Sequence, residues 1–387
     1  MMNIHDLEYG AIKYDTPLYI FDIDDVKKTV TGFKEKLGSD ADICFAMKAN
    51  PFLTRQISKI VERIEVCSYG EYKICKTLEV DPEKILISGV MKEKDEILEI
   101  LNYYKGKCVY TIESPNQFYC LADWSEENRE VVNVYLRLTS GNQFGMDEKK
   151  IRQLMIVSKE YPFLKIKGIH YFSGTQKKSA ERVKKELLYL DNICKELSDI
   201  EELEYGPGIP VSYFQDREIN ENKFVAVIHE TTNMMEWKGR ITLEMGRALT
   251  ASCGYYLTEI KDIKKNSKKN YCIVNGGIHQ LQYDGQIRGM YTPKFQILRK
   301  NAYGDEHEWT ICGSLCTVND VLIQNVKIKG DLREGDIIVF EMAGAYAPME
   351  GMSLFLSHEL PTVSFYDKES GWKLIRSKQP TYQLNME

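Results

Sequence analysis

Eight short β-rich runs alternate with amphipathic helical stretches along the first part of this chain, and no other feature constrains the fold as strongly. The runs span residues 43–47, 64–66, 85–87, 108–112, 132–138, 166–171, 203–205 and 241–243. Between them, apolar residues recur three and four positions apart, as in 116–121, 148–159 and 180–197, which indicates helices. Eight successive strand and helix units predict a closed parallel (β/α)8 barrel of the TIM type.

The pattern changes after residue 249, where alternating strands follow one another with few helices. Strands are predicted at 253–260, 271–274, 294–298, 321–329, 337–341 and 362–366. They indicate an antiparallel β-sandwich or β-barrel domain, and residues 17–21 read as a further strand that we expect to join it. A chain of 387 residues fits two domains, because single cores stop growing at roughly 250–300 residues. The predicted division is a barrel over 22–248 and a β domain of 1–21 with 249–387.

Charge and apolar content exclude several classes of protein. The 51 basic and 57 acidic side chains leave a net charge of −6, which does not favour binding to nucleic acid or to an anionic membrane. No apolar run approaches the ~20 residues needed to cross a bilayer, and the first residues lack a signal-peptide pattern, so we expect a cytoplasmic protein. The 10 cysteines show no paired metal-ligand spacing, so we predict reduced thiols and no metal site.

Chemically distinctive residues follow the predicted strands, at the ends where a barrel of this kind builds its functional face. Lys48 closes the first strand, and Arg137 lies at the end of the fifth. Burial of a lysine favours the neutral, nucleophilic amine, which suits Schiff-base formation with an aldehyde. The alternative for Lys48 is a strand-end lysine whose ammonium reaches out to water.

The loops after the last three strands are rich in glycine and contain Thr175 and Arg247. Because glycine N–H groups approach a ligand closely, and a hydroxyl and a cation add to them, these loops predict a phosphate cradle. Glu244 lies beside it, where a carboxylate can bond a protonated ring nitrogen. An amine, a phosphate cradle and such an acid are what pyridoxal 5'-phosphate requires. His170 and Phe172 are placed to cover a face of its ring, although a satisfied core histidine is the alternative for His170.

Over both predicted domains the chain resembles the fold-type III pyridoxal-phosphate decarboxylases, the family of ornithine, arginine, diaminopimelate and carboxynorspermidine decarboxylases. Residues 45–50 are similar to the family's YAVKAN segment, 168–176 to its GIHCHIGSQ loop, 206–208 to its GGG turn and 244–247 to its EPGR motif. Residues 313–320 are similar to its GPxCxxxD motif, and residues 343–346 to its AGAY motif. The motifs occur in the family's order.

The resemblance implies a role for each matching residue. Lys48 would form the Schiff base with the cofactor, Glu244 would meet the pyridine nitrogen, and Cys316 would protonate the quinonoid carbon after carbon dioxide leaves. Phosphate contacts would come from Thr175, Gly206, Gly208, Gly246, Arg247 and Tyr346. The resemblance also implies a homodimer with shared active sites, each completed by the β domain of the other subunit, which carries Cys316 and Tyr346.

Departures from the family pattern bear on the substrate. Phe172 stands where the family stacks a histidine on the cofactor, and Pro207 replaces the middle glycine of the GGG turn. Thr317 stands where decarboxylases of basic amino acids carry an acidic residue, which argues against ornithine, lysine or diaminopimelate as the substrate. Substrate contacts are predicted for Arg137, His279, Arg288 and Thr317. Arg288 would pair with a carboxylate, and the alternative for it and for His279 is a solvated loop position.

The sequence therefore predicts pyridoxal-phosphate-dependent decarboxylation of a free amino acid or of an aminoacyl group. Residues 208–214 and 275–280 look more like a biosynthetic subgroup, some of whose members act on an aminoacyl group carried by a partner protein. An amino-acid racemase on the same fold is a further alternative, although it needs a second base on the opposite face of the cofactor. A non-catalytic binding protein that has kept the fold is the remaining one.

Overall fold

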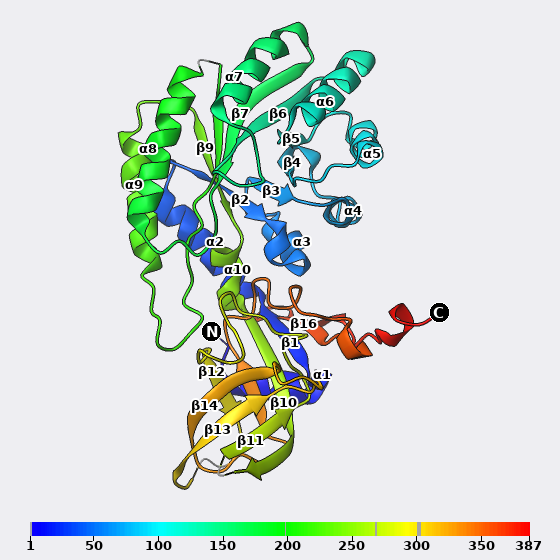
Figure 1. The fold of residues 1–387 in the computed structure, drawn as a ribbon, viewed down its shortest axis with the longest axis vertical. Coiled ribbons are helices and arrows are strands. Elements are labelled where there is room, and N and C mark those ends of the chain that lie inside the picture. The colour runs from blue at the N-terminus through cyan, green and yellow to red at the C-terminus, as the bar shows by residue number, and fades with distance from the viewer. Residues whose placement is uncertain (1, 198, 268, 300–302) are drawn as a thin grey trace. The chain divides into compact units, whose positions relative to one another are not determined.

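The computed structural model describes residues 2–197, 199–267, 269–299 and 303–387 (Figure 1). They form two compact units. The barrel unit comprises Thr29–Pro210 and Asn220–Leu249, and the sheet unit comprises Met1–Lys28, Val211–Ile219 and Thr250–Glu387. Among the helices of these described residues, none combines the length and the apolar character needed to cross a membrane.

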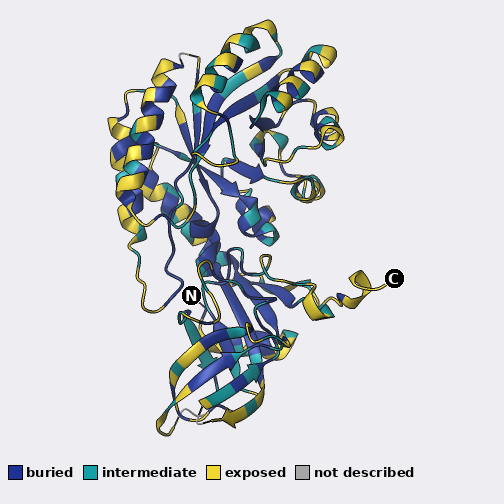
Figure 2. Cartoon of the chain, in the orientation of Figure 1, coloured by how far each residue is buried: buried dark blue, intermediate teal, exposed yellow. Residues whose placement is uncertain are grey.

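Eight parallel strands form the closed barrel, which confirms the predicted fold class. They are β2 (Asp42–Ala46), β3 (Arg63–Val66), β4 (Ile85–Ile87), β5 (Val109–Ile112), β6 (Val132–Leu138), β7 (Leu164–Phe172), β8 (Glu202–Gly206) and β9 (Arg240–Met245). The barrel closes where β2 pairs with β9, with Cys44 opposite Glu244. Because both faces of the strands are covered, they consist largely of buried apolar residues (Figure 2).

One helix, α2, precedes the first barrel strand and the others follow barrel strands, with their exposed residues on the side away from the strands (Figure 2). They are α2 (Ile23–Leu37), α3 (Thr54–Ile57), α4 (Tyr69–Thr77), α5 (Lys94–Tyr104), α6 (Pro115–Asn128), α7 (Glu148–Val157), α8 (Ala180–Glu196), α9 (Glu221–Met234) and α10 (Arg247–Thr250). Short polar side chains start several of them: the Ser68 hydroxyl accepts the N–H of Glu71, and the Asp147 carboxylate accepts that of Lys150. These caps fix where each loop at the strand ends gives way to a helix.

The sheet unit is built on nine strands. They are β1 (Leu18–Asp22), β10 (Gly254–Asn266), β11 (Lys269–Val274), β12 (Phe295–Leu298), β13 (Glu306–Cys312), β14 (Val321–Lys329), β15 (Ile337–Phe340), β16 (Thr362–Asp367) and β17 (Gly371–Arg376). The main path runs β14-β13-β11-β10-β1-β16-β17, so the amino-terminal strand joins this sheet as expected. Most pairs are antiparallel, but β1 pairs parallel to β16 and β11 parallel to β13, so the sheet is mixed rather than wholly antiparallel.

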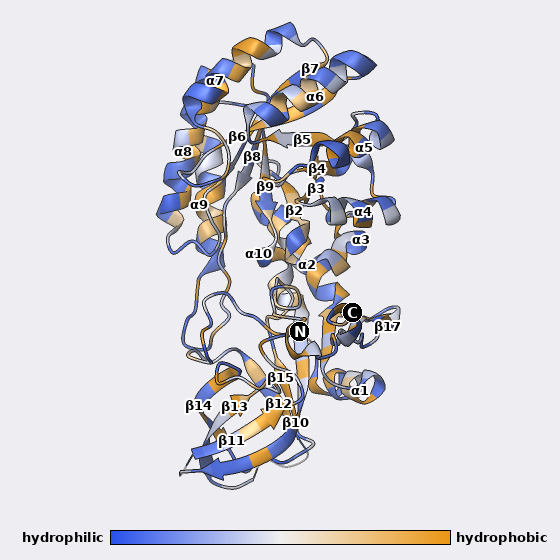
Figure 3. Cartoon of the chain, turned by 45° about the vertical axis from the view of Figure 1, so that its right-hand side comes forward, coloured by the Kyte–Doolittle hydropathy of each residue, from blue (hydrophilic) through white to orange (hydrophobic). Residues whose placement is uncertain are grey.

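Three elements of the sheet unit were not predicted from the sequence. The helix α1 (Ile4–Tyr14) is capped by Asn3 and buries Leu7 and Ala11 in a cluster with strand residues such as Leu257. The strand β13 has charged residues at its start, and β17 alternates lysine and arginine with apolar residues at the sheet edge. Figure 3 shows these hydrophilic stretches beside the apolar strands. Charge on an edge strand such as β17 is common because it discourages pairing with other chains, and charge in either strand weakens the apolar signal.

Candidate active site

Lys48 lies in a tight turn, η1 (Met47–Ala49), directly after the barrel strand β2. The strand stops there because Asn50 donates its N–H to the Met47 carbonyl at 3.0 Å, and Pro51 begins a second short turn. Met47 and Ala49 are fully buried, whereas the Lys48 side chain is 35% exposed. The turn therefore anchors itself on two apolar neighbours and leaves the amine of Lys48 accessible.

Two buried carboxylates hold the amine of Lys48. Its Nζ lies 2.6 Å from Oε2 of Glu65 and 3.4 Å from Oε1 of Glu244, both of which are almost fully buried. The Cys67 sulfur lies 3.5 Å from the same nitrogen, and the Phe172 ring centroid lies 6.0 Å away. Residues from β2, β3, β7 and β9 thus converge on one amine, and the two carboxylates favour its charged form.

Glu244 is held ionised by its neighbours. Burial alone would raise the pKa of its carboxyl, but the Lys48 ammonium and the hydrogen bond to His170 outweigh burial and hold that pKa well below its usual range. His170 Nε2 lies 2.8 Å from Oε2 of Glu244, and since the carboxylate is charged the ring nitrogen donates. The other ring nitrogen, Nδ1, is buried and has no hydrogen-bond partner among the described residues.

The glycine-rich loops after β7, β8 and β9 pack so closely that side chains are excluded. A Cβ on Gly208, whose φ is +60°, would lie 2.2 Å from the Gly174 carbonyl oxygen. A Cβ on Gly206 would lie 2.3 Å from the Phe172 ring, and one on Gly246 would lie 2.7 Å from Cβ of Ala49, beside Lys48. These loops form a closely packed cradle against the turn that carries the lysine.

A cation and a hydroxyl complete the cradle. Arg247 opens the short helix α10 after β9, and its Nε donates to Oγ1 of Thr175 at 3.2 Å. An arginine and a threonine beside glycine N–H groups are a donor set suited to a phosphate. With the amine of Lys48 and the ionised Glu244 at the same end of the barrel, the residues fit pyridoxal phosphate.

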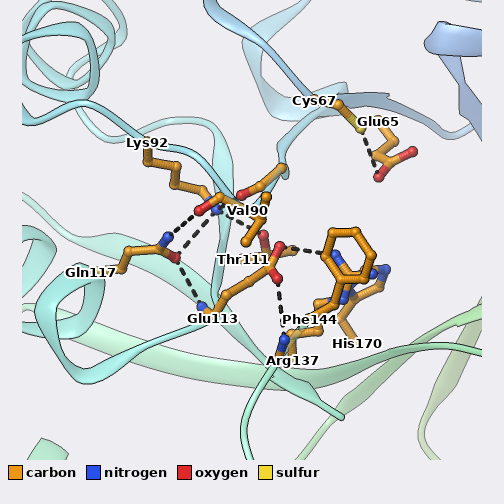
Figure 4. A network of polar contacts seen from close by, with 12 residues as sticks. Glu65, Cys67, Val90, Lys92, Thr111, Glu113, Gln117, Arg137, Phe144 and His170 are labelled. Atoms are coloured by element: carbon orange, nitrogen blue, oxygen red, sulfur yellow. Dashed lines mark hydrogen bonds and ion pairs between the residues drawn. The ribbon is translucent and has the colours of Figure 1, made fainter. Parts of the chain in front are cut away.

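Arg137 belongs to a second network on neighbouring strand ends (Figure 4). Its Nη1 donates to Oε1 of Glu113 at 2.8 Å, and its guanidinium lies 4.7 Å from the Phe144 ring centroid. Glu113 also accepts the N–H of Gly145 at 3.2 Å. Arg137 is paired in register with His170 on the adjacent strand β7, so the network fixes a cation next to the Glu244 and His170 pair.

Lys92 extends this network to the loop before α5. Its Nζ donates to the Gly89 carbonyl, to Oγ1 of Thr111 at 3.3 Å and to Oε1 of Gln117 at 3.3 Å. Gln117 Oε1 also accepts the N–H of Glu113 at 2.9 Å (Figure 4). Burial lowers the pKa of the Lys92 ammonium to about 8, because the loss of hydration outweighs the attraction of Glu113.

Lys92 is therefore expected to react with acylating reagents at lower pH than an ordinary lysine. A lowered pKa means that the neutral amine forms earlier as the pH rises, so the pH midpoint of Lys92 acetylation should lie near about 8. In the denatured chain the same residue should show the ordinary lysine midpoint of about 10.4. Peptide mass spectrometry after short acetylation pulses gives both values, and equal midpoints in the two states would contradict the network.

The remaining predicted residues lie in the sheet unit. Cys316 is exposed and Thr317 partly exposed in the loop between β13 and β14, and Tyr346 lies after β15. His279 is buried, with neither ring nitrogen bonded among the described residues, and burial lowers its pKa to about 4. Arg288 is exposed and lines a cavity of about 280 Å³. The predicted barrel residues thus lie around Lys48, and the predicted sheet residues lie in the other unit.

Asp320 organises the loop that carries Cys316. Its two carboxylate oxygens accept the N–H groups of Ile278 at 2.9 Å and Leu315 at 2.7 Å. A Cβ on Gly277 or on Gly313 would lie less than 3 Å from this carboxylate, which explains the glycine at each position. The loop before Cys316 and the segment before His279 are therefore tied to one another.

Several residues of the site were not predicted from sequence. Glu65 and Glu113 are carboxylates at the ends of otherwise apolar strands, which is a visible signal, but nothing in the sequence shows that they meet Lys48 and Arg137. Cys67 lies in the distinctive stretch 65–71 at the end of the second strand but was given no role, and Lys92 was not singled out. In the described residues, no group of three or more histidine, cysteine, aspartate or glutamate side chains is arranged to hold a metal ion.

Known proteins are similar to this chain over most of its length. The family model described as pyridoxal-dependent decarboxylase, C-terminal sheet domain, matches residues 18–344. The chain is 24% identical to the L-glutamyl-(BtrI acyl-carrier protein) decarboxylase of Niallia circulans, over 97% of this chain and 95% of that protein. It is 27% identical to the 2-((L-alanin-3-ylcarbamoyl)methyl)-2-hydroxybutanedioate decarboxylase of Staphylococcus aureus, over 89% and 92% of the two chains. The crystal structure of diaminopimelate decarboxylase from Helicobacter pylori complexed with L-lysine superposes with a TM-score of 0.85 at 22% identity, over 99% and 98% of the two chains.

Proposed function

The chain belongs to the pyridoxal-dependent decarboxylases, and from this premise we propose that it removes the α-carboxylate of an amino acid or aminoacyl group whose far end carries no ammonium. The observation that carries the proposal is the amine of Lys48 held between Glu65 and Glu244 at the barrel end that bears the glycine cradle. Pyridoxal phosphate supplies an aldehyde that binds amines and a ring that accepts electrons from the bond being broken.

The barrel residues have separate tasks in this proposal. Lys48 is the amine that holds the cofactor and yields it to the substrate, and Glu244 meets the ring nitrogen with a charge kept by His170. Thr175, Arg247 and the backbone of Gly206, Gly208 and Gly246 hold the phosphate. Phe172 offers an apolar face to the ring without a proton to exchange.

The sheet domain supplies the proton in this proposal. Two subunits form a homodimer with shared sites, and Cys316 and Tyr346 reach the cofactor bound to the other subunit. The exposed thiol of Cys316 returns a proton to the α-carbon, and the Tyr346 hydroxyl adds a phosphate contact. The predicted domain division, a barrel over 22–248 and a β domain of 1–21 with 249–387, is part of the same proposal.

The cavity in the sheet unit supports a substrate without a distal ammonium. It adjoins the Cys316 loop through Asn319 and is lined by Gln282, Gln286, Arg288 and apolar residues, with no carboxylate among its lining residues. The exposed guanidinium of Arg288 suits a carboxylate or an acyl carbonyl and disfavours a cationic end. The Gln282 and Gln286 amides donate to the Ile278 and Tyr291 carbonyls and shape the cavity wall. Thr317, in place of an acidic residue, agrees with this chemistry.

A carrier-bound substrate is the second form of this proposal. The similarity to a decarboxylase whose substrate is an L-glutamyl carrier protein runs over 97% of this chain. A glutamyl group linked to a carrier through its side-chain carboxyl keeps a free α-amino acid at one end and has a neutral acyl linkage at the other, which fits the same cavity chemistry.

The test is carbon dioxide release from a panel of substrates that differ in the charge of the far end. The panel contains ornithine, lysine, diaminopimelate, glutamate and γ-glutamyl thioesters of pantetheine or of a carrier protein. We expect release from glutamate or a γ-glutamyl form, and activity confined to the three amino acids with a distal ammonium would contradict the proposal.

Replacing Arg288 by methionine should raise the KM for the preferred substrate roughly ten- to a hundredfold, because a hydrogen bond to a charged partner is lost. kcat should change little, since the group lies away from the reacting atoms. Arg299→Met is the matched control, because Arg299 is a partly exposed arginine of the same unit that donates to the Asp331 and Lys329 carbonyls and does not line the cavity. A fall in kcat with unchanged KM would place Arg288 outside the substrate contact.

A further inference from the structure

Lys177 is a buried lysine directly beyond the β7 phosphate loop. Its side chain is 2% exposed, and its Nζ pairs with Oε2 of Glu186 on α8, which is 9% exposed. The same nitrogen donates to the Tyr205 hydroxyl at 3.2 Å. Burial lowers the pKa of Lys177, since the lost hydration outweighs the bond to Glu186. A buried pair of this kind costs hydration that apolar side chains would not, so stability alone does not explain its presence.

The pair connects both glycine loops of the cradle. The N–H of Lys177 donates to the Gly208 carbonyl at 3.0 Å, and its Nζ lies 3.5 Å from the Gly206 carbonyl oxygen. The other oxygen of Glu186 accepts the Ser173 hydroxyl at 2.6 Å. The ion pair therefore holds Ser173 at the start of the β7 loop and lies against the Gly206 carbonyl, while the backbone N–H of Lys177 holds the Gly208 carbonyl.

Pro207 makes such an anchor necessary. A proline has no N–H, so the turn between Gly206 and Gly208 offers one donor fewer to a phosphate and one fewer bond to hold itself in place. Gly208 has a φ of +60°, and a Cβ there would lie 3.3 Å from Cε of Lys177. The lysine thus packs against the part of the turn that proline leaves without a backbone donor.

We propose that Lys177 and Glu186 are positioning residues for the cofactor phosphate: they hold the loops 173–177 and 206–208 at the spacing that receives it. The inference rests on the proposed function, in that these loops are taken to bind the phosphate of pyridoxal phosphate. Lys177 acts through the loops and does not contact the cofactor. The affinity for the phosphate group should depend on the pair, and the affinity for the pyridine ring should not.

The experiment compares two ligands that differ only in the phosphate. Cofactor-free wild type, Lys177→Met and the double variant Lys177→Met/Glu186→Leu are titrated with pyridoxal phosphate and with pyridoxal, and binding is followed by absorbance. Lys177→Met should raise the Kd for pyridoxal phosphate roughly tenfold or more, the loss expected for a charge-assisted hydrogen bond, and change the Kd for pyridoxal by less than about twofold. In Lys177→Met the Glu186 carboxylate keeps its contact with Arg182, whose Nε lies 3.0 Å from Oε1. The double variant removes this buried carboxylate as well and should show the same selective loss of affinity for pyridoxal phosphate in a stable fold.

Lys167→Met is the matched control, because Lys167 lies on the same strand β7 in an exposed pair with Glu201 and should change neither affinity. Equal loss for both ligands, or no loss for pyridoxal phosphate, would overturn the proposal and leave the pair a purely structural one. If Lys177→Met does not fold, the double variant and Glu186→Gln test the proposal through the same comparison of the Kd for pyridoxal phosphate with the Kd for pyridoxal. A wild type that binds pyridoxal phosphate no better than pyridoxal would instead refute the phosphate cradle, and with it this inference.

Discussion

Replacing Lys48 by alanine is expected to abolish the covalent retention of pyridoxal phosphate and to reduce carbon dioxide release by on the order of 10³-fold or more. The amine is 2.6 Å from Glu65 and 3.4 Å from Glu244, and no other lysine contacts this carboxylate pair among the described residues. Loss of the side chain removes the group that forms and releases the bond to the cofactor aldehyde.

The variant should nonetheless fold, because Lys48 is partly exposed and its buried neighbours Met47 and Ala49 anchor the turn. Absorbance near ~420 nm, the region expected of a lysine bound to pyridoxal, reports retention after dialysis, and trapped carbon dioxide reports turnover. Lys94→Ala, an exposed lysine at the start of α5, is the control and should keep both signals. A yellow, active Lys48→Ala protein would overturn the assignment.

Replacing Glu244 by glutamine is expected to lower kcat by roughly 10²–10³-fold, the loss seen when one fixed electrostatic partner of the reacting group is removed. Glutamine keeps the shape but removes the charge that Lys48 and His170 maintain. KM should change little, because the phosphate cradle is intact. Steady-state kinetics with the preferred substrate measure the split between kcat and KM, and Glu201→Gln on the exposed pair with Lys167 is the control.

The same variant has a pH signature. The pKa of Glu244 in the folded protein lies below the ordinary value of 4.5. The charged carboxylate therefore stabilises the fold at pH values above 4.5, and this stabilisation decreases as the pH falls below 4.5 toward the pKa of the folded state. Wild type should therefore lose more unfolding free energy than Glu244→Gln when the pH is lowered from about 5 to 3, as urea titrations would show. Parallel losses in the two proteins would contradict the ion pair of Lys48 with Glu244.

The barrel could be predicted from sequence because each of its strands is a short apolar run followed by a helix with regular apolar spacing. The predicted runs at 64–66 and 85–87 fall within β3 and β4, and residues 17–21 overlap β1 in the second sheet. The strand β13 was missed because its first residues, beginning with Glu306, are charged. The two parallel pairs of that sheet were missed because strand direction depends on where β1 and β13 insert, which periodicity does not record.

The candidate site was predictable only as far as local motifs reach. Lys48, Glu244 and the glycine loops stand out because each combines an unusual residue with a strand end. The partners that fix their chemistry come from distant positions: Glu65 lies 17 residues from Lys48, and Glu186 reaches Lys177 from the next helix. Such contacts depend on how the barrel closes. The reacting groups could therefore be predicted from the sequence, but the residues that position them could not.

The most direct test of the account is the ratio of carbon dioxide released to amine formed by the purified holoenzyme, with the enantiomers of the remaining substrate resolved at the same time points. The account predicts one carbon dioxide for each amine and no interconversion of enantiomers. Interconversion of enantiomers without release of carbon dioxide would show a racemase and contradict it.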